Sequence, residues 1–280
     1  MTTLEAGLAI GPFELRRRAA HGASAEVWDA SRRADQRRVA LKLLDIESLD
    51  DAAEWQRRFE QEARTARRLS HPDIVAFVDT GREGPWHWLA YEWLDGHDLS
   101  AWMTPGNRPS ARQALRVAER LARALAHAHD LGIIHRDVKP ANVRVDPAAD
   151  QVKLIDFGVA RSDDGSRTRT GLLLGTPAYM APEVLLGGDA SPSSDLYALA
   201  VLLFELLCGR RPYEAPSLGQ LLRMMATTAA ADVRSHRPDL SEACAQTLAV
   251  ALQRDPGARH PDGHALADAL ARAAQSLPPP

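Results

Sequence analysis

The sequence has 280 residues, of which 45% are hydrophobic and 25% are charged, as in an ordinary globular protein. This length is enough for two modest lobes with sizeable cores, or for one large domain. The formal net charge of −3 gives no general basic field, which argues against nucleic acid as a partner.

The two cysteines, Cys208 and Cys244, have neither CxxC spacing nor nearby histidines, which argues against a disulfide scaffold and a zinc site. We expect both to be buried free thiols. The N-terminus lacks the basic start and apolar core of a signal peptide, and the most apolar run is too short to span a bilayer. We therefore expect a cytoplasmic chain without a membrane span. Residues 276–280 form a Pro-rich tail that cannot continue a helix.

In chain order, the first predicted element is a small antiparallel sheet over residues 13–44, where apolar and polar residues alternate between Gly and Ala turn signals. An acidic helix is predicted from about Asp51 to Leu69, which is rich in good helix formers. Residues 86–96 are predicted to be strands that run into a connector. Residues 111–130 repeat Leu and Val at helical spacing, and a further helix is predicted from about residue 193 through Leu207.

Residues 135–142 read His-Arg-Asp-Val-Lys-Pro-Ala-Asn, and Asp156-Phe157-Gly158 follow shortly after. Between them, the apolar runs 143–145 and 152–155 are separated by turn-forming residues, which predicts two strands of a small hairpin. Such a hairpin would bring Asn142 and Asp156 close together. Their side-chain oxygens suit a hard cation such as Mg²⁺, and Asp137 would remain available to orient a hydroxyl.

The motifs H-R-D-x-K-P-x-N at 135–142, D-F-G at 156–158 and A-P-E at 181–183 occur in the order and at the spacing of protein kinases, which the chain resembles. The resemblance covers about residues 10–270. Lys139 and residues 175–183 resemble the serine/threonine kinases, and the variant motifs are most similar to the eukaryotic-like serine/threonine kinases of bacteria.

The resemblance implies an α+β, bilobal protein-kinase-like fold. It has a small N-lobe with an antiparallel sheet and one main helix, and a larger, mainly helical C-lobe. We expect the kinase domain at residues 10–275, with the N-lobe at about 10–94, a hinge at about 92–97 and the C-lobe at about 98–275.

The resemblance also assigns catalytic roles. Asp137 would orient the substrate hydroxyl, Lys139 would neutralise the transferred phosphate, and Lys42 would pair with the α/β-phosphates. Glu62 would pair with Lys42, an assignment that depends on its spacing to the His-Pro-Asp-Ile-Val segment at residues 71–75.

For the nucleotide, residues 18–27 stand where a kinase has its G-x-G-x-x-G-x-V loop. Only Gly22 is retained, and Ala20 and Ala25 replace the outer glycines. This departure affects the expected nucleotide affinity and rate. The residues expected to bind ATP are Ala20, His21, Gly22, Ala23, Ser24, Ala25, Val27, Ala40, Lys42, Tyr91, Glu92, Leu94, Asn142 and Asp156. Tyr91 would guard the back pocket, and Glu92 and Leu94 would give backbone contacts to adenine.

As cofactors the resemblance implies ATP with Mg²⁺, with Mn²⁺ as an alternative metal, held by Asn142 and Asp156. Residues 159–170 would form an activation loop with Thr168 and Thr170 as phosphorylation sites, and Arg136 would pair with the added phosphate. Thr176 would contact Asp137 and Lys139. Two further roles are architectural: Asp195 would brace the backbone of residues 135–142, and Arg259 would pair with Glu183.

The expected function is ATP-dependent phosphorylation of serine and threonine hydroxyls in protein substrates, regulated by activation-loop autophosphorylation. Two alternatives are weighed against it. A pseudokinase scaffold or nucleotide sensor is suggested by Ala20 and Ala25, but Lys42, Asp137 and Asn142 argue against it. A small-molecule kinase is disfavoured by the 176–183 segment. No motif decides for or against a homodimer.

Overall fold

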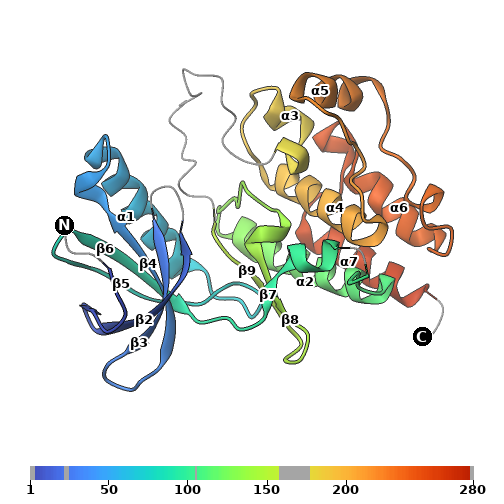
Figure 1. Cartoon of the computed structure of the whole chain (residues 1–280). Coiled ribbons are helices and arrows are strands. Elements are labelled where there is room, and N and C mark those ends of the chain that lie inside the picture. The colour runs from blue at the N-terminus through green and yellow to red at the C-terminus, as the bar shows by residue number, and fades with distance from the viewer. Residues whose placement is uncertain (1–3, 22–24, 105, 158–176, 278–280) are drawn as a thin grey trace. The chain divides into compact units, whose positions relative to one another are not determined.

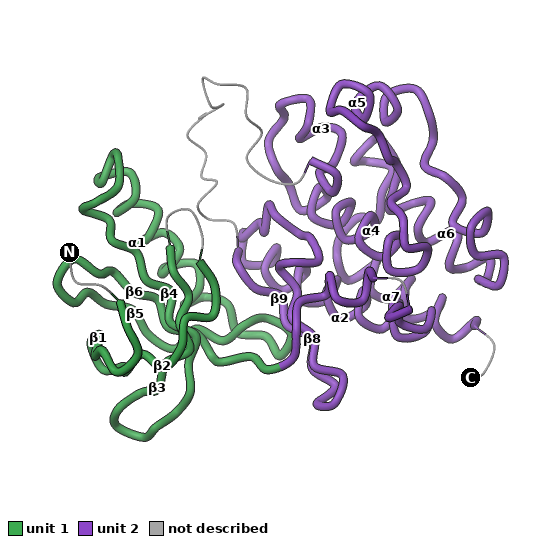
Figure 2. Tube along the Cα trace, viewed as in Figure 1, with its two compact units in different colours: residues 1–95 green, residues 96–280 purple. Residues whose placement is uncertain are grey.

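The computed structural model describes residues 4–21, 25–104, 106–157 and 177–277. The chain divides into two compact units, residues 1–95 and 96–280 (Figure 2). The boundary falls within the connector that follows the last long strand of the first unit. Each unit has its own core and is described by itself.

Unit 1 is built on a six-stranded antiparallel sheet with the order β1-β2-β3-β4-β6-β5. The strands are β1 (Ala9–Ile10), β2 (Phe13–His21), β3 (Glu26–Arg32), β4 (Arg38–Asp45), β5 (Phe77–Glu83) and β6 (Trp86–Glu92). Strand β4 alternates as its sequence predicts: Val39, Leu41 and Leu43 are fully buried, and Lys42 lies on the other face.

The two faces of this sheet carry different cores. On one face, the Phe13 and Trp88 rings pack edge to face with centroids 5.2 Å apart, within an apolar cluster that also includes Leu41. On the other face, Phe59 of α1 (Ala52–Arg68) packs with Leu89. The Asp51 side chain begins this helix by accepting a hydrogen bond from the N–H of Glu54. The predicted sheet and the predicted helix over residues 51–69 are confirmed (Figure 1).

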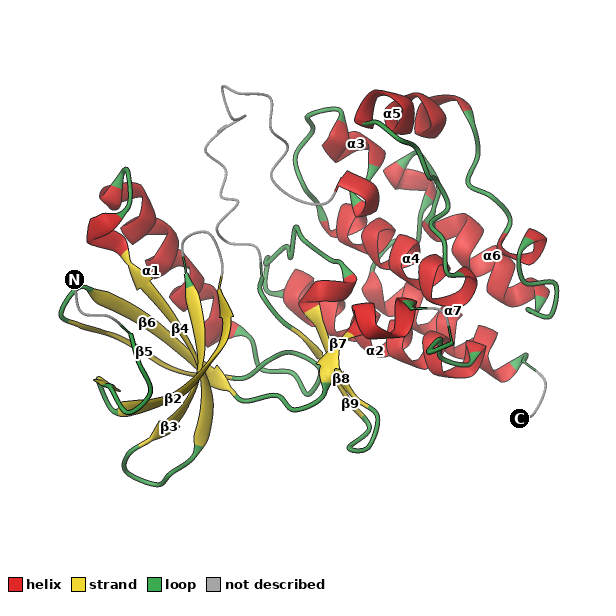
Figure 3. Cartoon of the chain, in the orientation of Figure 1, coloured by secondary structure: helices red, strands yellow, loops and turns green. Residues whose placement is uncertain are grey.

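Unit 2 is mainly helical (Figure 3). Its helices are α2 (Ala111–Asp130), α3 (Pro182–Leu185), α4 (Pro192–Cys208), α5 (Leu218–Thr227), α6 (Glu242–Ala251) and α7 (Gly263–Gln275). Helix α2 begins with a capping box, in which Ser110 and Gln113 each bond the backbone of the other. Helix α4 is buried on nearly all sides, and α2 packs against both α4 and α7. The predicted helices over 111–130 and 193–207 are confirmed.

A small antiparallel sheet in unit 2 has the order β7-β8-β9, with β7 (His97–Asp98), β8 (Val143–Asp146) and β9 (Gln151–Leu154). Val143 pairs with Leu154, so the residues just before β8 and just after β9 meet at one end of the hairpin. There the N–H of Ile155 donates to the carbonyl oxygen of Asn142 at 2.9 Å. The predicted hairpin is confirmed, and it sets Asn142 opposite Ile155, the residue before Asp156.

Cys244 is buried as predicted, but Cys208 is only partly buried, because it lies at the C-terminal end of α4. Burial raises the pKa of each thiol to about 11, so both are neutral at physiological pH. Within the described ranges, none of the helices has the length and apolar character needed to cross a membrane.

Candidate active site

The residues expected to carry the chemistry in unit 2 form a hydrogen-bonded cluster in the loop 135–142. The Lys139 Nζ lies 2.7 Å from Asp137 Oδ2. The Asn142 Nδ2 donates to the same carboxylate oxygen at 3.0 Å and to the Asp137 carbonyl at 2.8 Å. A short 3₁₀ turn, Pro140–Asn142, returns the chain so that Asn142 faces Asp137. The structure thus brings Asp137, Lys139 and Asn142 together, as the sequence predicts.

A buried carboxylate of α4 fixes the backbone of this loop. Asp195, 2% exposed, accepts hydrogen bonds from the N–H of His135 at 2.8 Å and from the N–H of Arg136 at 2.9 Å. Arg136 has φ +67°, in the left-handed region that an L-residue enters at a cost of roughly 1–2 kcal/mol. The two hydrogen bonds hold this conformation, which turns the chain directly before Asp137. The bracing role predicted for Asp195 is confirmed.

His135 is fully buried and connects the loop to the end of the hairpin. Its Nδ1 accepts the N–H of Asp137 at 3.2 Å, which makes Nε2 the protonated nitrogen that donates to the Ile155 carbonyl at 3.0 Å. Burial lowers the pKa of His135 from its ordinary value, because the imidazolium would lose its hydration. A neutral imidazole therefore joins the backbone on both sides of the site.

His129 on α2 is a further support of this loop that the sequence did not reveal. His129 Nε2 lies 2.9 Å from Asp195 Oδ2, so it adds a third donor to the carboxylate that holds the loop. No sequence signal marks this contact, because His129 and Asp195 are 66 residues apart. Only the packing of α2 on α4 brings them together.

The oxygen atoms near Asn142 suit a metal that is bound in part by a nucleotide. The Asn142 Nδ2 faces two acceptors, which leaves its Oδ1 as the acceptor atom of the amide. Asp156 has φ +55° and is exposed, and its carboxylate has no hydrogen-bond partner within the part of the chain that the structure describes. Among those residues, no cluster of three or more His, Cys, Asp and Glu forms a complete metal cage. In proteins, Mg²⁺ is usually bound by one or two protein side chains together with phosphate oxygens and water, and does not need a complete protein cage.

In unit 1, the predicted lysine and glutamate form an ion pair. Lys42 Nζ on β4 lies 2.6 Å from Glu62 Oε1 on α1. The Tyr91 hydroxyl donates to the same glutamate oxygen at 3.4 Å, and its ring packs edge to face on Phe77. Lys42 and Ala40 share one face of β4, and Val27 pairs with Lys42 across the strands. The structure therefore selects Glu62 from the several glutamates of α1 as the partner of Lys42.

The glycine-poor loop is described only at its two ends. Ala20 pairs with Val27, and His21 pairs with Glu26, which lies 3.6 Å from the imidazole. Ala25 is half-buried beside the cluster under α1. The nucleotide contacts predicted for Gly22, Ala23 and Ser24 lie outside the described residues, as do the roles predicted for Thr168, Thr170 and Thr176.

The connector residues after β6 are tied to their own unit. The N–H of Glu92 donates to the Ala76 carbonyl at 2.9 Å, and its carboxylate accepts the N–H of Ala76 at 2.7 Å. The backbone N–H and the carboxylate of Glu92 are thus both engaged within unit 1. The Leu94 side chain is buried.

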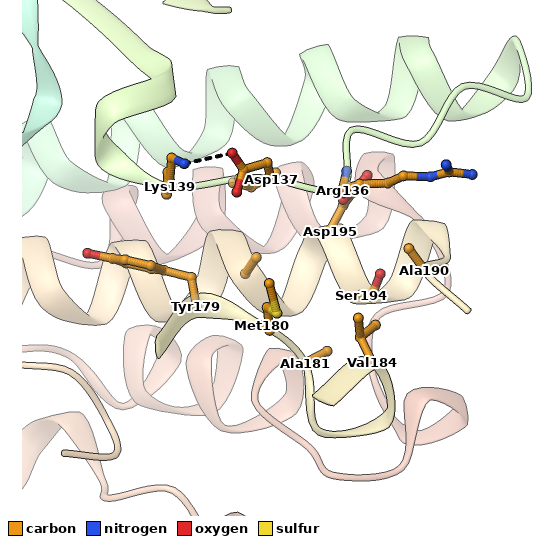
Figure 4. Close-up of a pocket in the computed structure, with 12 residues that line it drawn as sticks. Arg136, Asp137, Lys139, Tyr179, Met180, Ala181, Val184, Ala190, Ser194 and Asp195 are labelled. Atoms are coloured by element: carbon orange, nitrogen blue, oxygen red, sulfur yellow. Dashed lines mark hydrogen bonds and ion pairs between the residues drawn. The ribbon is translucent and has the colours of Figure 1, made fainter. Parts of the chain in front are cut away.

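A pocket in unit 2 lies beside Asp137. Its walls come from the loop 135–142, from α4 and from the segment 179–184 (Figure 4). Figure 4 shows the Lys139–Asp137 contact on one wall, with Tyr179 and Met180 across from it, and the Arg136 side chain directed away from Lys139. The Tyr179 hydroxyl donates to Glu205 at 2.5 Å, and burial raises its pKa.

The segment that forms this wall is held by a buried ion pair. The Arg259 side chain is fully buried, and it binds Glu183 through two nitrogens at 2.7 and 2.8 Å. Its guanidinium also lies 4.8 Å from the Tyr197 ring centroid on α4. The pair predicted between Arg259 and Glu183 is confirmed.

Comparisons with known proteins agree with this geometry. The family described as Protein kinase domain matches residues 13–270. The chain is 37% identical over 280 residues to the serine/threonine-protein kinase PknA of Mycobacterium tuberculosis, covering 96% of this chain and 63% of PknA. It is 32% identical over 251 residues to PrkC of Bacillus subtilis, covering 89% of this chain and 38% of PrkC. The chain thus spans less than two thirds of the length of either relative.

A solved structure gives the same result for the fold. The kinase domain of Mycobacterium tuberculosis PknI (C20A mutant) superposes with a TM-score of 0.74 at 28% identity, covering 98% of this chain and 100% of that one. The family match extends over most of the chain and includes every residue of the clusters around Lys42 and Asp137. The chain belongs to the protein kinase family.

Proposed function

We propose that this chain transfers the terminal phosphoryl group of ATP to serine and threonine hydroxyls of protein substrates. The observation that carries the proposal is the cluster of Asp137, Lys139 and Asn142, held on a backbone that Asp195 fixes. The names of PknA and PrkC as serine/threonine-protein kinases support the substrate class. The domain would extend over residues 10–275 and act in the cytoplasm.

Phosphoryl transfer requires mainly positioning and neutralisation of charge. Asp137 would accept a hydrogen bond from the attacking hydroxyl and orient it. Lys139, which already lies against this carboxylate, would move its charge toward the transferred phosphate. Lys42, kept extended by Glu62, would bind the α/β-phosphates.

The metal proposed here is Mg²⁺, with Mn²⁺ as a substitute, bound through Asn142 and Asp156. When bound, it would neutralise the phosphate oxygens of the nucleotide. The protein itself would contribute the amide oxygen of Asn142 and the carboxylate of Asp156, at the end of one hairpin. Asn142 is held there by its two hydrogen bonds to Asp137.

Regulation through Thr168 and Thr170 is part of the proposal, with Arg136 as the partner of the added phosphate. Mass spectrometry of protein incubated with ATP and Mg²⁺ should find phosphate on one of these threonines. Active protein that carries phosphate at neither position would contradict this assignment.

The test of the main proposal is transfer of ³²P from labelled ATP, with Mg²⁺, to the chain itself and to a generic protein substrate. Wild type should label phosphoserine and phosphothreonine, identified by acid hydrolysis. Asp137→Asn should reduce the rate by about 10²–10⁴-fold, the range for loss of a positioned acid or base. Asp239→Asn, a surface carboxylate paired with Arg237, serves as the matched control and should keep the rate. Protein that binds nucleotide but labels no substrate in any phosphorylation state would refute phosphoryl transfer.

A further inference from the structure

A second charged cluster in unit 1 lies outside the residues discussed so far. Arg38, the first residue of β4, donates through Nε to Asp29 Oδ1 at 2.9 Å and through Nη2 to Asp29 Oδ2 at 2.8 Å. Its remaining terminal nitrogen, Nη1, donates to Asp95 Oδ1 at 3.2 Å. The guanidinium carbon lies 4.1 Å from the ring centroid of Trp93, and the Trp93 Nε1 also donates to Asp95 Oδ1, at 3.0 Å.

The cluster has a fixed end and a connector end. The Asp29 side chain on β3 is only 7% exposed, and it is held in the sheet by both adjacent strands. Asp95 is 71% exposed, and Trp93 and Asp95 belong to the segment that follows β6. Arg38 joins these ends. Its planar guanidinium binds both oxygens of the Asp29 carboxylate and stacks on the Trp93 ring. The hydrogen bond to Asp29 raises the pKa of Arg38, so its charge is permanent.

Arg38 also lies on a particular face of the sheet. Side chains alternate along β4, so Arg38, Ala40 and Lys42 share one face. Asp29 is directly opposite Ala40 on β3, and Val27 is opposite Lys42. The cluster therefore lies on the same face of the sheet as Lys42 and the proposed nucleotide-contacting residues Val27 and Ala40. It occupies the end of that face nearer the connector.

We infer that Arg38 is a positioning residue for nucleotide binding, which holds residues 93–95 against the nucleotide-facing side of β3 and β4. The inference rests on the proposed function for the identity of the ligand. Residues 93–95 include Leu94, whose backbone is proposed to contact adenine. The Trp93 ring stacks on the Arg38 guanidinium, and Trp93 and Arg38 both donate to the Asp95 carboxylate. These contacts fix the side chains on either side of the Leu94 backbone.

Two variants test this role. Asp95→Ala removes the acceptor that Arg38 and Trp93 share, leaves the Arg38–Asp29 fork intact, and changes an exposed side chain. Arg38→Met removes the whole bridge. Because the adenine contact is made equally in the ground state and the transition state, both should raise the KM for ATP, by about 3- to 10-fold, and leave kcat within about twofold. Arg38→Lys keeps the charge without the fork and should fall between wild type and Arg38→Met.

The matched controls are Asp35→Ala and Arg32→Met, which break an Arg–Asp pair at the turn of the same β3–β4 hairpin. This pair makes no contact with residues 93–95 in any hydrogen bond or ion pair of the described residues. Both should leave the KM unchanged. A second readout does not need catalysis: hydrogen exchange at the amides of residues 93–95 should accelerate by about tenfold in Asp95→Ala and Arg38→Met, and remain unchanged in the controls.

The outcomes separate the two proposals. If wild type transfers phosphate and Asp95→Ala and Arg38→Met keep the KM of wild type, the positioning role is refuted and the proposed function stands. If wild type does not transfer phosphate, the proposed function fails, and the dissociation constant of ATP together with amide exchange tests Arg38. A loss of kcat equal to the loss of kcat/KM would also refute the role, because it would mark an interaction made only in the transition state.

Discussion

The Asp195 carboxylate accepts the backbone N–H of Arg136 at 2.9 Å while Arg136 adopts φ +67°. A strained residue next to the proposed catalytic aspartate is thus held by a buried group from a distant helix. The strain cannot relax while Asp195 is in place, so the direction of Asp137 depends on a side chain that does not touch substrate.

Asp195→Asn should lower kcat by about 100-fold, because an amide offers one acceptor where two are needed, and small displacements of reacting groups have effects of this size. The KM for ATP should change little. Steady-state kinetics at varied ATP would check both values. Arg136→Gly also removes the proposed partner of the activation-loop phosphate, so it is the reference for the double variant. Asp195→Asn should cost less kcat in the Arg136→Gly background than in wild type, since glycine adopts positive φ without strain. An equal cost in both backgrounds would contradict this explanation.

Lys42 and Glu62 should act as a coupled pair. Lys42→Met and Glu62→Gln should each lower kcat/KM, and the double variant should lose less than the sum, with a coupling of about 0.5–3 kcal/mol. Tyr91→Phe removes the 3.4 Å hydrogen bond to Glu62 and should change kcat/KM by about fivefold at most. Additive losses in the cycle would show that the pair does not work as a unit.

The Asn142–Asp156 site predicts a change in metal requirement. Asp156→Asn should raise the Mg²⁺ concentration for half-maximal rate by at least about tenfold, because a neutral amide replaces the exposed carboxylate. Titration of the initial rate with Mg²⁺ at fixed ATP would measure it. Asp150→Asn changes a carboxylate at the opposite, turn end of the β8–β9 hairpin and should leave the titration unchanged.

The Arg259–Glu183 pair should be important for stability. Glu183→Gln leaves the guanidinium of Arg259, which is fully buried, without its charge partner, and breaking such a pair costs about 3–5 kcal/mol of unfolding free energy. Urea denaturation followed by circular dichroism would measure the loss. The exposed pair of Arg116 and Asp150 is the comparison: Arg116→Ala should cost less than about 1 kcal/mol.

The buried His135 predicts a loss of stability in acid. Its pKa is lowered in the folded chain, so the unfolded chain binds more protons as the pH falls through about 6.5. The stability from its neutral form is complete above that pH and is lost progressively below it, by up to about 1.4 kcal/mol per pH unit. His135→Gln should flatten the dependence of Tm on pH between 7.5 and 5.5.

The sequence alone determined the local helices and strands and the motifs that contain the proposed catalytic residues. Helix α2 begins at Ala111, directly after its N-cap Ser110, and ends at Asp130, because its capping box and its apolar repeat are both local features. The β8–β9 hairpin follows from two short apolar runs and the turn between them. For the same reason, the sequence could predict that Asn142 and Asp156 lie at one end of a hairpin.

Only the tertiary structure decided which distant side chains meet. Glu62 is one of several glutamates on α1, and the packing of that helix on the sheet selects it for Lys42. His129 and Asp195 are 66 residues apart, and Arg38 and Asp95 are 57 apart. Periodicity describes which face of its own element a residue occupies. It contains no information about which other element will pack against that face, and these contacts come from that packing.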